Sequence, residues 1–347
     1  MHFLIYGTGA VGGMIGARLA FSGQRVSFLA RPEVADRLRS NGLTLIQDGA
    51  RRLFDAHVVT DLLGQSCEDR PDVILLTVKG YDCLAAAQAI RRAWADPPPV
   101  VCWLNGVGHE ATLSAWLGQD RVIPATLTTA VQPTEPGVVR VERERGIGLA
   151  RGHALVPALG DAFVRAGMET KYYAFADAMK WSKLLTNIVG NATSAILDWT
   201  VDEVFRHPGF ARVEIEALRE STRVMRKLGL RPVNLPGVPV GLLARLVFLP
   251  PPLLQPILGR IVASGRGKKR PSFHADIGRG RSEVDWINGA VVQHAEKLGL
   301  GAPANSVLTG TLLQLVHTKG PIPSDLRQPG NLLASAAARH VPGISGV

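Results

Sequence analysis

The sequence predicts an α/β protein in which a parallel sheet with helices on its faces precedes a mostly helical domain. Three observations support this prediction. The 347 residues are too many for one ordinary core. Short β-rich runs alternate with helical patterns up to about residue 125, and helical periodicity takes over after about Gly152. We expect domains at 1–174 and 175–325, and a loosely packed tail at 326–347.

Five short apolar runs are the expected strands of the parallel sheet: His2–Tyr6, Arg25–Leu29, Val73–Val78, Val100–Leu104 and Arg121–Ala125. Between the second and the third, turn residues at 48–50 separate Leu43–Gln47 from Arg51–Val58. This pattern predicts a hairpin inserted in the sheet unit. The β-like stretch Leu127–Leu149, which contains the turn sequence PTEPG, is expected to extend the same sheet.

Helical periodicity defines the rest of the chain. The expected helices lie near 153–166, 175–197, 202–229, 279–298 and 303–317. The stretch Arg231–Gly265 differs, because it combines many prolines with many Leu and Val residues. We interpret it as either an apolar lid or an insertion packed on the helices.

Charge and cysteine content exclude several classes of protein. The net charge is +10, but the basic residues are scattered and aromatic residues make up only 6%, so we expect no nucleic-acid partner. Cys67, Cys83 and Cys102 lack the spacing of a metal site or a disulfide framework, which predicts no metal and favours a cytoplasmic location. The uncharged run Leu246–Gly259 is too short and too rich in proline to span a bilayer, so we expect no membrane.

The first expected strand runs directly into a glycine fingerprint. Gly7-Thr8-Gly9-Ala10-Val11-Gly12 follows HFLIY and leads into a helical run that reaches Phe21. In a Rossmann-type domain, the first glycine permits a tight turn, the second lets the backbone approach a pyrophosphate, and the third lets helix and strand pack closely. The phosphates would face the N-terminus of the helix. The segment therefore predicts dinucleotide binding, and the alternative is a purely structural glycine-rich turn.

The end of the second expected strand selects the dinucleotide. An NAD site usually carries Asp or Glu there, whereas this chain has Ala30 followed by Arg31. A guanidinium group can pair with a 2′-phosphate in a fork geometry, which favours NADP(H). The acidic Glu33 argues the other way, but Pro32 should start a helix that carries Glu33 away from the pocket.

Two further strand ends carry polar residues, and ligands of open α/β sheets bind beyond the carboxyl ends of strands. Lys79 follows LLTV, and Asn105 with Gly106 follows VVCWL. We expect Lys79 and Asn105 at the cofactor. The alternatives are a surface lysine that caps a strand and a simple Asn-Gly turn.

The run WSKLLTNIVGNATSAIL places Lys183, Asn187 and Asn191 at i, i+4 and i+8, which is one face of a continuous helix. An ammonium group beside a nicotinamide can polarise a ketone and donate a proton to the alkoxide that hydride transfer creates. The alternative is a set of hydrogen bonds between helices.

The ordered motifs GTGAVGG, LARPE, TVKGYD, WLNGVG, TTAVQPTEPGVV, WSKLLTNIVGN and RSEVDWINGAVV resemble the ketopantoate reductase family over about residues 1–230 and 265–318. The resemblance implies a Rossmann domain and an all-α C-terminal domain similar to that of 6-phosphogluconate dehydrogenase. It also implies NADPH-dependent reduction of 2-dehydropantoate to pantoate, a step of pantothenate biosynthesis, and a small-molecule keto acid as partner; a homodimer is left open.

The resemblance also implies roles for single residues. Lys183 would be the general acid, with Glu283 supporting the lysine or the substrate hydroxyl. Asn187 and Asn191 would bind the substrate, and Ser272 in PSFHAD would bind its carboxylate. The segment Asp276–Glu283 is one residue shorter than the family pattern. His274 is the alternative proton donor if Lys183 is not.

Three other readings of the chain stay open. The first is a reductase of the same family that acts on another 2-keto acid. The second is a different β-hydroxyacid or opine-type dehydrogenase on the same two-domain plan. The third is a non-catalytic NADP(H) sensor.

Overall fold

The computed structural model describes residues 1–63, 70–266 and 271–345, so Cys67 lies outside the described residues. The chain divides into two compact units. The first comprises Met1–Leu104, Gly108–Lys180 and Leu235–Val238, and the second comprises Asn105–Val107, Trp181–Asn234 and Pro239–Val347. The long passage from the first unit to the second thus falls between Lys180 and Trp181, rather than between residues 174 and 175.

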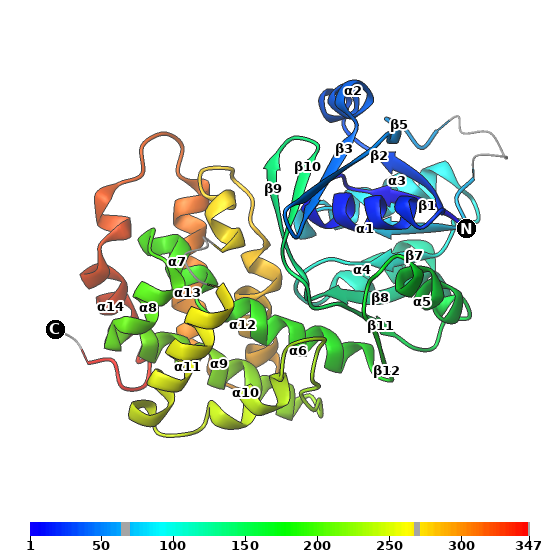
Figure 1. Cartoon of the computed structure of the whole chain (residues 1–347). Coiled ribbons are helices and arrows are strands. Elements are labelled where there is room, and N and C mark those ends of the chain that lie inside the picture. The colour runs from blue at the N-terminus through cyan, green and yellow to red at the C-terminus, as the bar shows by residue number, and fades with distance from the viewer. Residues whose placement is uncertain (64–69, 267–270, 346–347) are drawn as a thin grey trace. The chain divides into compact units, whose positions relative to one another are not determined.

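An eight-stranded sheet forms the centre of the first unit (Figure 1). Its order is β12 (Thr170–Tyr173), β11 (Ile147–Ala150), β8 (Val122–Leu127), β7 (Val100–Cys102), β6 (Val73–Leu76), β1 (His2–Tyr6), β2 (Arg25–Leu29) and β5 (His57–Val59). Every neighbouring pair is parallel except β11 with β8. Strand order reverses between β1 and β6, and the crevice beyond the carboxyl ends of such a pair is where dinucleotides bind.

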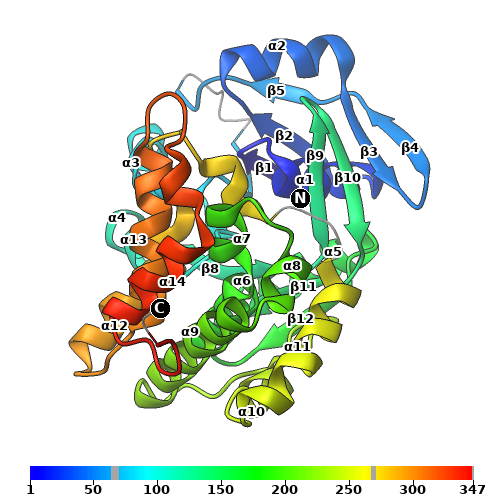
Figure 2. The ribbon, with the colours of Figure 1, turned by 90° about the vertical axis from the view of Figure 1, so that its left-hand side faces the viewer.

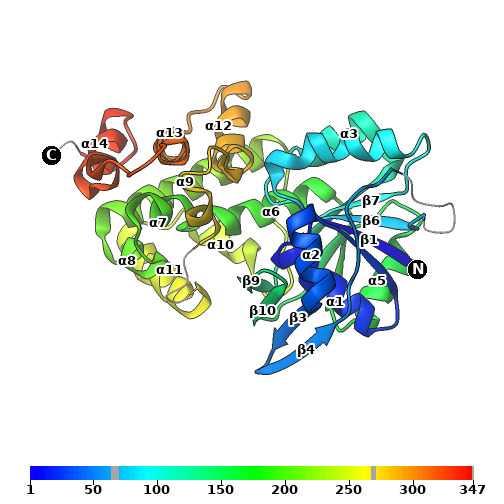
Figure 3. The ribbon, with the colours of Figure 1, turned by 90° about the horizontal axis from the view of Figure 1, so that it is seen from above.

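Helices cover both faces of this sheet, as Figure 3 shows for α3 and α5. The packed helices are α1 (Ala10–Phe21) and α5 (Val156–Arg165) on one face, and α3 (Cys83–Ala93) and α4 (His109–Leu117) on the other. Phe3 and Ile5 of β1 pack with α1 and α5, whereas Leu4 packs with α3 and α4. A strand buried on both sides must be apolar throughout, which explains the sequence HFLIY. Short elements complete this part: α2 (Pro32–Asn41), η2 (Gly80–Asp82) and η3 (Gln119–Arg121).

A second sheet corrects one expectation (Figure 2). The expected hairpin forms as β3 (Leu43–Gln47) and β4 (Ala50–Phe54), but it joins β10 (Val138–Arg143) and β9 (Ala130–Glu135) in a separate four-stranded sheet. Of the stretch 127–149, only β11 and the end of β8 belong to the main sheet. The reason is packing, because Val139 of β10 is buried in the core that α1 and β3 share.

The second unit is helical. Its elements are α6 (Ala176–Ile188, which starts in the first unit), α7 (Asn191–Leu197), α8 (Val201–Arg206), α9 (Pro208–Lys227), α10 (Val240–Leu246), α11 (Pro251–Arg266), η4 (Ser272–Asp276), η5 (Glu283–Trp286), α12 (Asn288–Lys297), α13 (Pro303–His317), η6 (Ser324–Arg327) and α14 (Pro329–Ala338). The twenty-residue α9 packs against α8, α10, α11, α12, α13 and α14. The α/β-then-helical fold class is confirmed.

The structure corrects expectations for this unit and decides one alternative that was open. The helix expected at 175–197 is two helices, because Gly190 adopts a left-handed conformation with φ of 65°. Of the two interpretations of the proline-rich stretch, the insertion packed on the helices is the one found, because the stretch forms α10 and α11, which pack on α8 and α9. The tail is not loosely packed throughout, since Leu332 and Ala336 of α14 are buried. Across the described residues, no helix has the length and apolar character that crossing a bilayer would require.

Candidate active site

The glycine loop of the first unit is open at Gly9 and closed at its other two glycines. A Cβ atom on Gly9 would meet nothing within 4 Å, whereas one on Gly12 would lie 2.0 Å from the carbonyl oxygen of Gly7. Gly7 has φ of +114°, and a Cβ there would lie 2.8 Å from the backbone of Thr77. Gly9 is also the N-cap of α1, and because it has no side chain, it makes no capping hydrogen bond to the N–H groups of the first turn. The loop leaves the first N–H groups of α1 for an outside acceptor, as a pyrophosphate site requires.

Thr77 is a loop-supporting residue that sequence reasoning missed. It follows β6, and its hydroxyl donates a hydrogen bond to the carbonyl oxygen of Gly7 at 2.7 Å. The hydroxyl thereby fixes the turn at the end of β1 against the neighbouring strand. Its signal in the sequence is a hydroxyl residue directly after a buried strand, which many structural threonines share.

Arg31 and Lys79 lie directly beyond strand ends of the same unit. Arg31 is exposed and is the N-cap of α2, whose first residue is Pro32. The exposed Glu33 therefore lies in the first turn of that helix, as expected. Lys79 is half-buried and precedes η2. Thr8, Ala10 and Val11 lie in the loop and the start of α1, all half-buried.

A buried ion pair lies at the carboxyl ends of β7 and β8, also within the first unit. Lys180 Nζ lies 2.8 Å from Glu110 Oε1 and donates a hydrogen bond to the carbonyl oxygen of Leu104 at 2.6 Å. Desolvation alone would lower the pKa of Lys180, but the charge of Glu110 and its hydrogen bond with the ammonium group outweigh this effect and raise it. Both groups are therefore charged at neutral pH, and together they fasten the first turns of α6 to the sheet.

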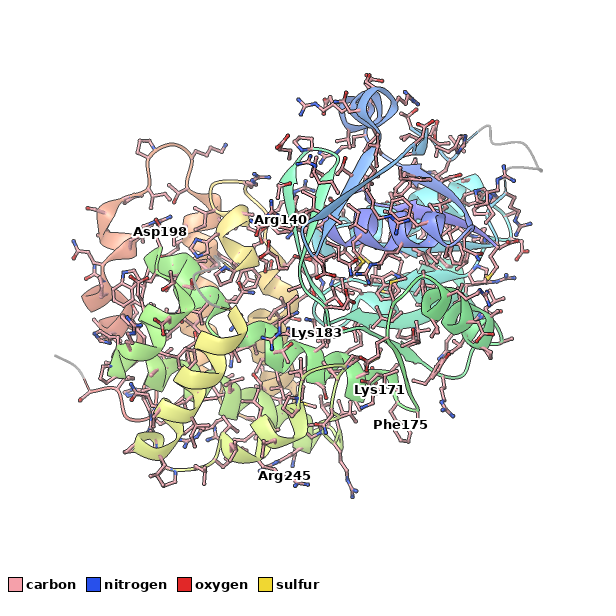
Figure 4. The ribbon with its side chains drawn as sticks, in the orientation of Figure 1. Arg140, Lys171, Phe175, Lys183, Asp198 and Arg245 are labelled. Atoms are coloured by element: carbon pink, nitrogen blue, oxygen red, sulfur yellow. The ribbon has the colours of Figure 1, made fainter. Side chains whose placement is uncertain are left out.

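The second unit brings Asn187 and Asn105 together. Asn187 Nδ2 donates a hydrogen bond to Asn105 Oδ1 at 3.2 Å. Lys183, which Figure 4 labels, lies one turn earlier on α6 and is half-buried. The apolar face of the helix is buried, with Leu184 and Ile188 both fully inaccessible. The polar face expected from the spacing of Lys183 and Asn187 is therefore confirmed for α6.

Asn191 does not continue that face, because it begins α7. Its Nδ2 group donates to Ser272 Oγ at 3.2 Å, and its Oδ1 accepts from the backbone N–H of Phe273 at 3.3 Å. The break before it is held by the fully buried Glu214, which accepts hydrogen bonds from the Gly190 N–H at 2.7 Å and from Thr193 Oγ1 at 2.5 Å. Glu214 is a second residue that sequence reasoning missed.

Glu283 opens η5 and is 3% exposed. Its N–H points to Asp276 Oδ2 at 3.4 Å, and the same oxygen accepts from Ser282 Oγ at 2.9 Å. At the other end of η5, the carbonyl oxygen of Trp286 accepts from the Val107 N–H at 3.1 Å. The segment that carries Asn105 is thereby joined to the turn that carries Glu283, inside the second unit.

The residues expected at the site fall into two groups, one in each unit, and the printed contacts among them join Asn187 with Asn105 and Asn191 with Ser272. Gly7 to Gly12, Arg31 and Lys79 lie in the first unit, and Asn105, Lys183, Asn187, Asn191, Ser272 and Glu283 lie in the second. No group of three or more potential metal ligands occurs in the ranges described above. Burial raises the pKa of the Cys83 thiol to about 12, so this thiol stays protonated and is no nucleophile.

The fold and the glycine loop define a dinucleotide-binding protein with a helical second domain, and comparison with known proteins specifies the family. The family model described as ketopantoate reductase PanE/ApbA matches residues 3–152, and the model of its C-terminal domain matches residues 176–316. The chain belongs to the ketopantoate reductase family. It is an oxidoreductase that acts on a CH–OH group.

Comparison with individual proteins gives the same family. The chain is 31% identical over 327 residues to a 2-dehydropantoate 2-reductase of Halobacterium salinarum, covering 92% of this chain and 100% of the relative. The crystal structure of a PanE/ApbA family ketopantoate reductase from Ralstonia eutropha JMP134 superposes on this chain with a TM-score of 0.77 at 28% identity. The match covers 91% of this chain and 98% of that chain. D-mandelate dehydrogenase with NADH and anilino(oxo)acetate shares the fold, with a TM-score of 0.74 at 21% identity and coverage of 91% and 98%.

Proposed function

We propose that the chain reduces 2-dehydropantoate to pantoate with NADPH in the cytoplasm. The observation that carries the proposal is the conjunction of an open glycine loop in one unit with Lys183 and the Asn187–Asn105 pair in the other. The match of the family models to both domains, and the names of relatives such as the one from Halobacterium salinarum, support the substrate.

Each residue has a proposed part in the reaction. NADPH, when bound, supplies the hydride. The loop from Gly7 to Gly12 and the N-terminus of α1 would hold the pyrophosphate, and Arg31 would pair with the 2′-phosphate. Lys79 is proposed to contact the cofactor from the end of β6.

The second unit would hold the keto acid and supply the proton. Lys183 would polarise the keto group and donate a proton to the alkoxide oxygen formed at C2. Asn187 and Asn105 would orient the keto acid and the nicotinamide. Asn191 and Ser272 would bind the carboxylate, and Glu283 would hold the new hydroxyl.

The test is a spectrophotometric assay of NADPH and NADH oxidation with a panel of 2-keto acids. The panel contains 2-dehydropantoate, pyruvate, 2-oxoisovalerate and benzoylformate, the keto acid that corresponds to mandelate. We expect the highest kcat/KM with 2-dehydropantoate and NADPH. A clear preference for another keto acid would assign that substrate instead, and oxidation of neither cofactor would refute the proposal.

Replacing Arg31 by alanine should weaken the binding of NADPH and leave the binding of NADH nearly unchanged. Losing a charge-assisted pair costs about 1.5–3 kcal/mol, and we expect the lower end because Arg31 is exposed. The KM for NADPH should therefore rise by about tenfold, while the KM for NADH changes little. Arg37→Ala, which removes another exposed arginine of α2, is the matched control. An equal loss for both cofactors would show that Arg31 does not contact the phosphate.

Gly9→Val should abolish dinucleotide binding and leave the fold intact. The new side chain has room within the protein, because nothing lies within 4 Å, but it would fill the space of the pyrophosphate. Titration of NADPH fluorescence measures binding, and a thermal melt measures the fold. Gly12→Val is the contrast, since it should lower the Tm as well. Undiminished NADPH affinity in Gly9→Val would mean that the loop is only structural.

A further inference from the structure

A cluster of polar side chains fixes η4 to α7 in the second unit. Asn191, at the start of α7, bonds both the Ser272 hydroxyl and the Phe273 N–H, as described above. One residue further along, His274 makes two more contacts with the same helix. Three consecutive residues of η4 are thus bound to α7.

The His274 ring uses both of its nitrogens. Nε2 lies 3.1 Å from Ser194 Oγ, and Nδ1 lies 3.5 Å from Asp198 Oδ1, at the C-cap of α7 (Figure 4 labels Asp198). The Ser194 hydroxyl donates its hydrogen to the carbonyl oxygen of Trp199, so its oxygen accepts from Nε2–H of the histidine. Arg327 Nη1 lies 3.1 Å from the other oxygen of Asp198.

The order Ser, His, Asp resembles a nucleophilic triad, but the contacts exclude that chemistry. Ser194 is fully buried and its hydrogen is bonded to a backbone carbonyl, so the imidazole cannot remove that proton as a general base. For the same reason Nε2 is occupied by Ser194 and is not aimed at a substrate. The cluster must act by holding structure.

We propose that His274 is a positioning residue, which holds η4 on α7 so that Ser272 and Asn191 present a joined pair of donors to the carboxylate of the keto acid. The assignment rests on the proposed function of Ser272. Asn191 and Asp198 lie at opposite ends of α7, with Ser194 between them. His274 holds η4 further along the helix, through the hydrogen bond of Nε2 to Ser194 and, when the ring is protonated, through Nδ1 to Asp198, so η4 is tied to α7 at a second point besides Asn191.

The first test separates substrate binding from turnover. His274→Leu removes both contacts but strands no buried charge, because Asp198 keeps Arg327 and Ser194 keeps its bond to Trp199. We expect the KM for the keto acid to rise about tenfold, as for lost hydrogen bonds that hold a binding group, with kcat and the KM for NADPH within twofold. His274→Gln retains an N–H donor of similar reach and should recover most of the KM.

The second test needs no substrate. Hydrogen exchange, followed by mass spectrometry on peptides that cover 272–276, reports the bond from the Phe273 N–H to Asn191. We expect exchange about tenfold faster in His274→Leu than in the wild type, restored in His274→Gln, and unchanged in peptides from α9 in both variants.

The outcomes are distinct. Unchanged exchange and an unchanged KM in His274→Leu would overturn the proposal, and so would a loss of kcat without a rise in KM, which would indicate a catalytic part for the ring. Faster exchange in a protein whose wild type reduces no keto acid would keep the positioning role and refute the proposed function instead.

Discussion

Lys183→Ala is expected to lose most of the turnover number, on the order of the 10²–10⁴-fold that a general acid contributes. NADPH affinity should stay nearly normal, because the glycine loop and Arg31 belong to the other unit. The side chain is half-buried on a helix whose apolar face packs independently, so alanine should not disturb the fold. Steady-state kinetics and a fluorescence titration of NADPH measure the two quantities.

The neighbouring variant Asn187→Ala is the control for this prediction. It should chiefly raise the KM for the keto acid if Asn187 only holds the substrate through its pair with Asn105. Near-normal turnover in Lys183→Ala would make the lysine a packing residue. His274 would then be the remaining candidate from the sequence, although the contact of its Nε2 with Ser194 argues against it as proton donor.

Lys180→Met is expected to destabilise the protein by about 3–5 kcal/mol, because it leaves Glu110 as an uncompensated charge in a buried site. The Lys180 side chain is 4% exposed and that of Glu110 is 20% exposed, so water can restore only part of the lost interaction. The free energy of unfolding from urea titration is the measurement. Lys297→Met, which changes an exposed lysine of α12, should stay within about 0.5 kcal/mol.

A double variant tests the cause of this loss. Lys180→Met combined with Glu110→Leu removes both charges, and replacing a buried pair by apolar groups is often neutral. We therefore expect the double variant to regain most of the stability that the single variant loses. A single variant as stable as the wild type, or a double variant worse than the single one, would show that the pair is not what holds α6 to the sheet.

The elements that the sequence predicted well are those set by local rules. The glycine fingerprint, the five parallel strands and the start of α2 at Pro32 each depend on short-range geometry and on burial of both faces of a sheet. The pairing of Asn187 with Asn105 was not predictable as a contact, because 82 residues separate the two amides. The sequence predicts only, for each residue separately, that it belongs to the site.

The errors have tertiary causes. The run from 175 to 197 reads as one helix, and the break at Gly190 depends on Glu214, 24 residues away, and on Val201, which leaves no room for a Cβ. The second sheet depends on β3 meeting β10 across the chain. Lys180 and Glu110 each look like surface residues in the sequence, since charged groups are rarely buried unless a partner is present.

The segment Leu235–Val238 has a consequence for how the protein can be made. It belongs to the first unit, where Leu235 is buried and a Cβ on Gly146 would touch Pro236 at 3.0 Å. On the ribosome, this part of the first unit is synthesised about 55 residues after Lys180. At synthesis rates of roughly 5–20 residues per second, the dinucleotide-binding unit stays incomplete for about 3–11 s, until Leu235–Val238 has been synthesised. A gene fragment that stops at Lys180 therefore encodes an incomplete domain, and a productive division of the gene must lie beyond Val238.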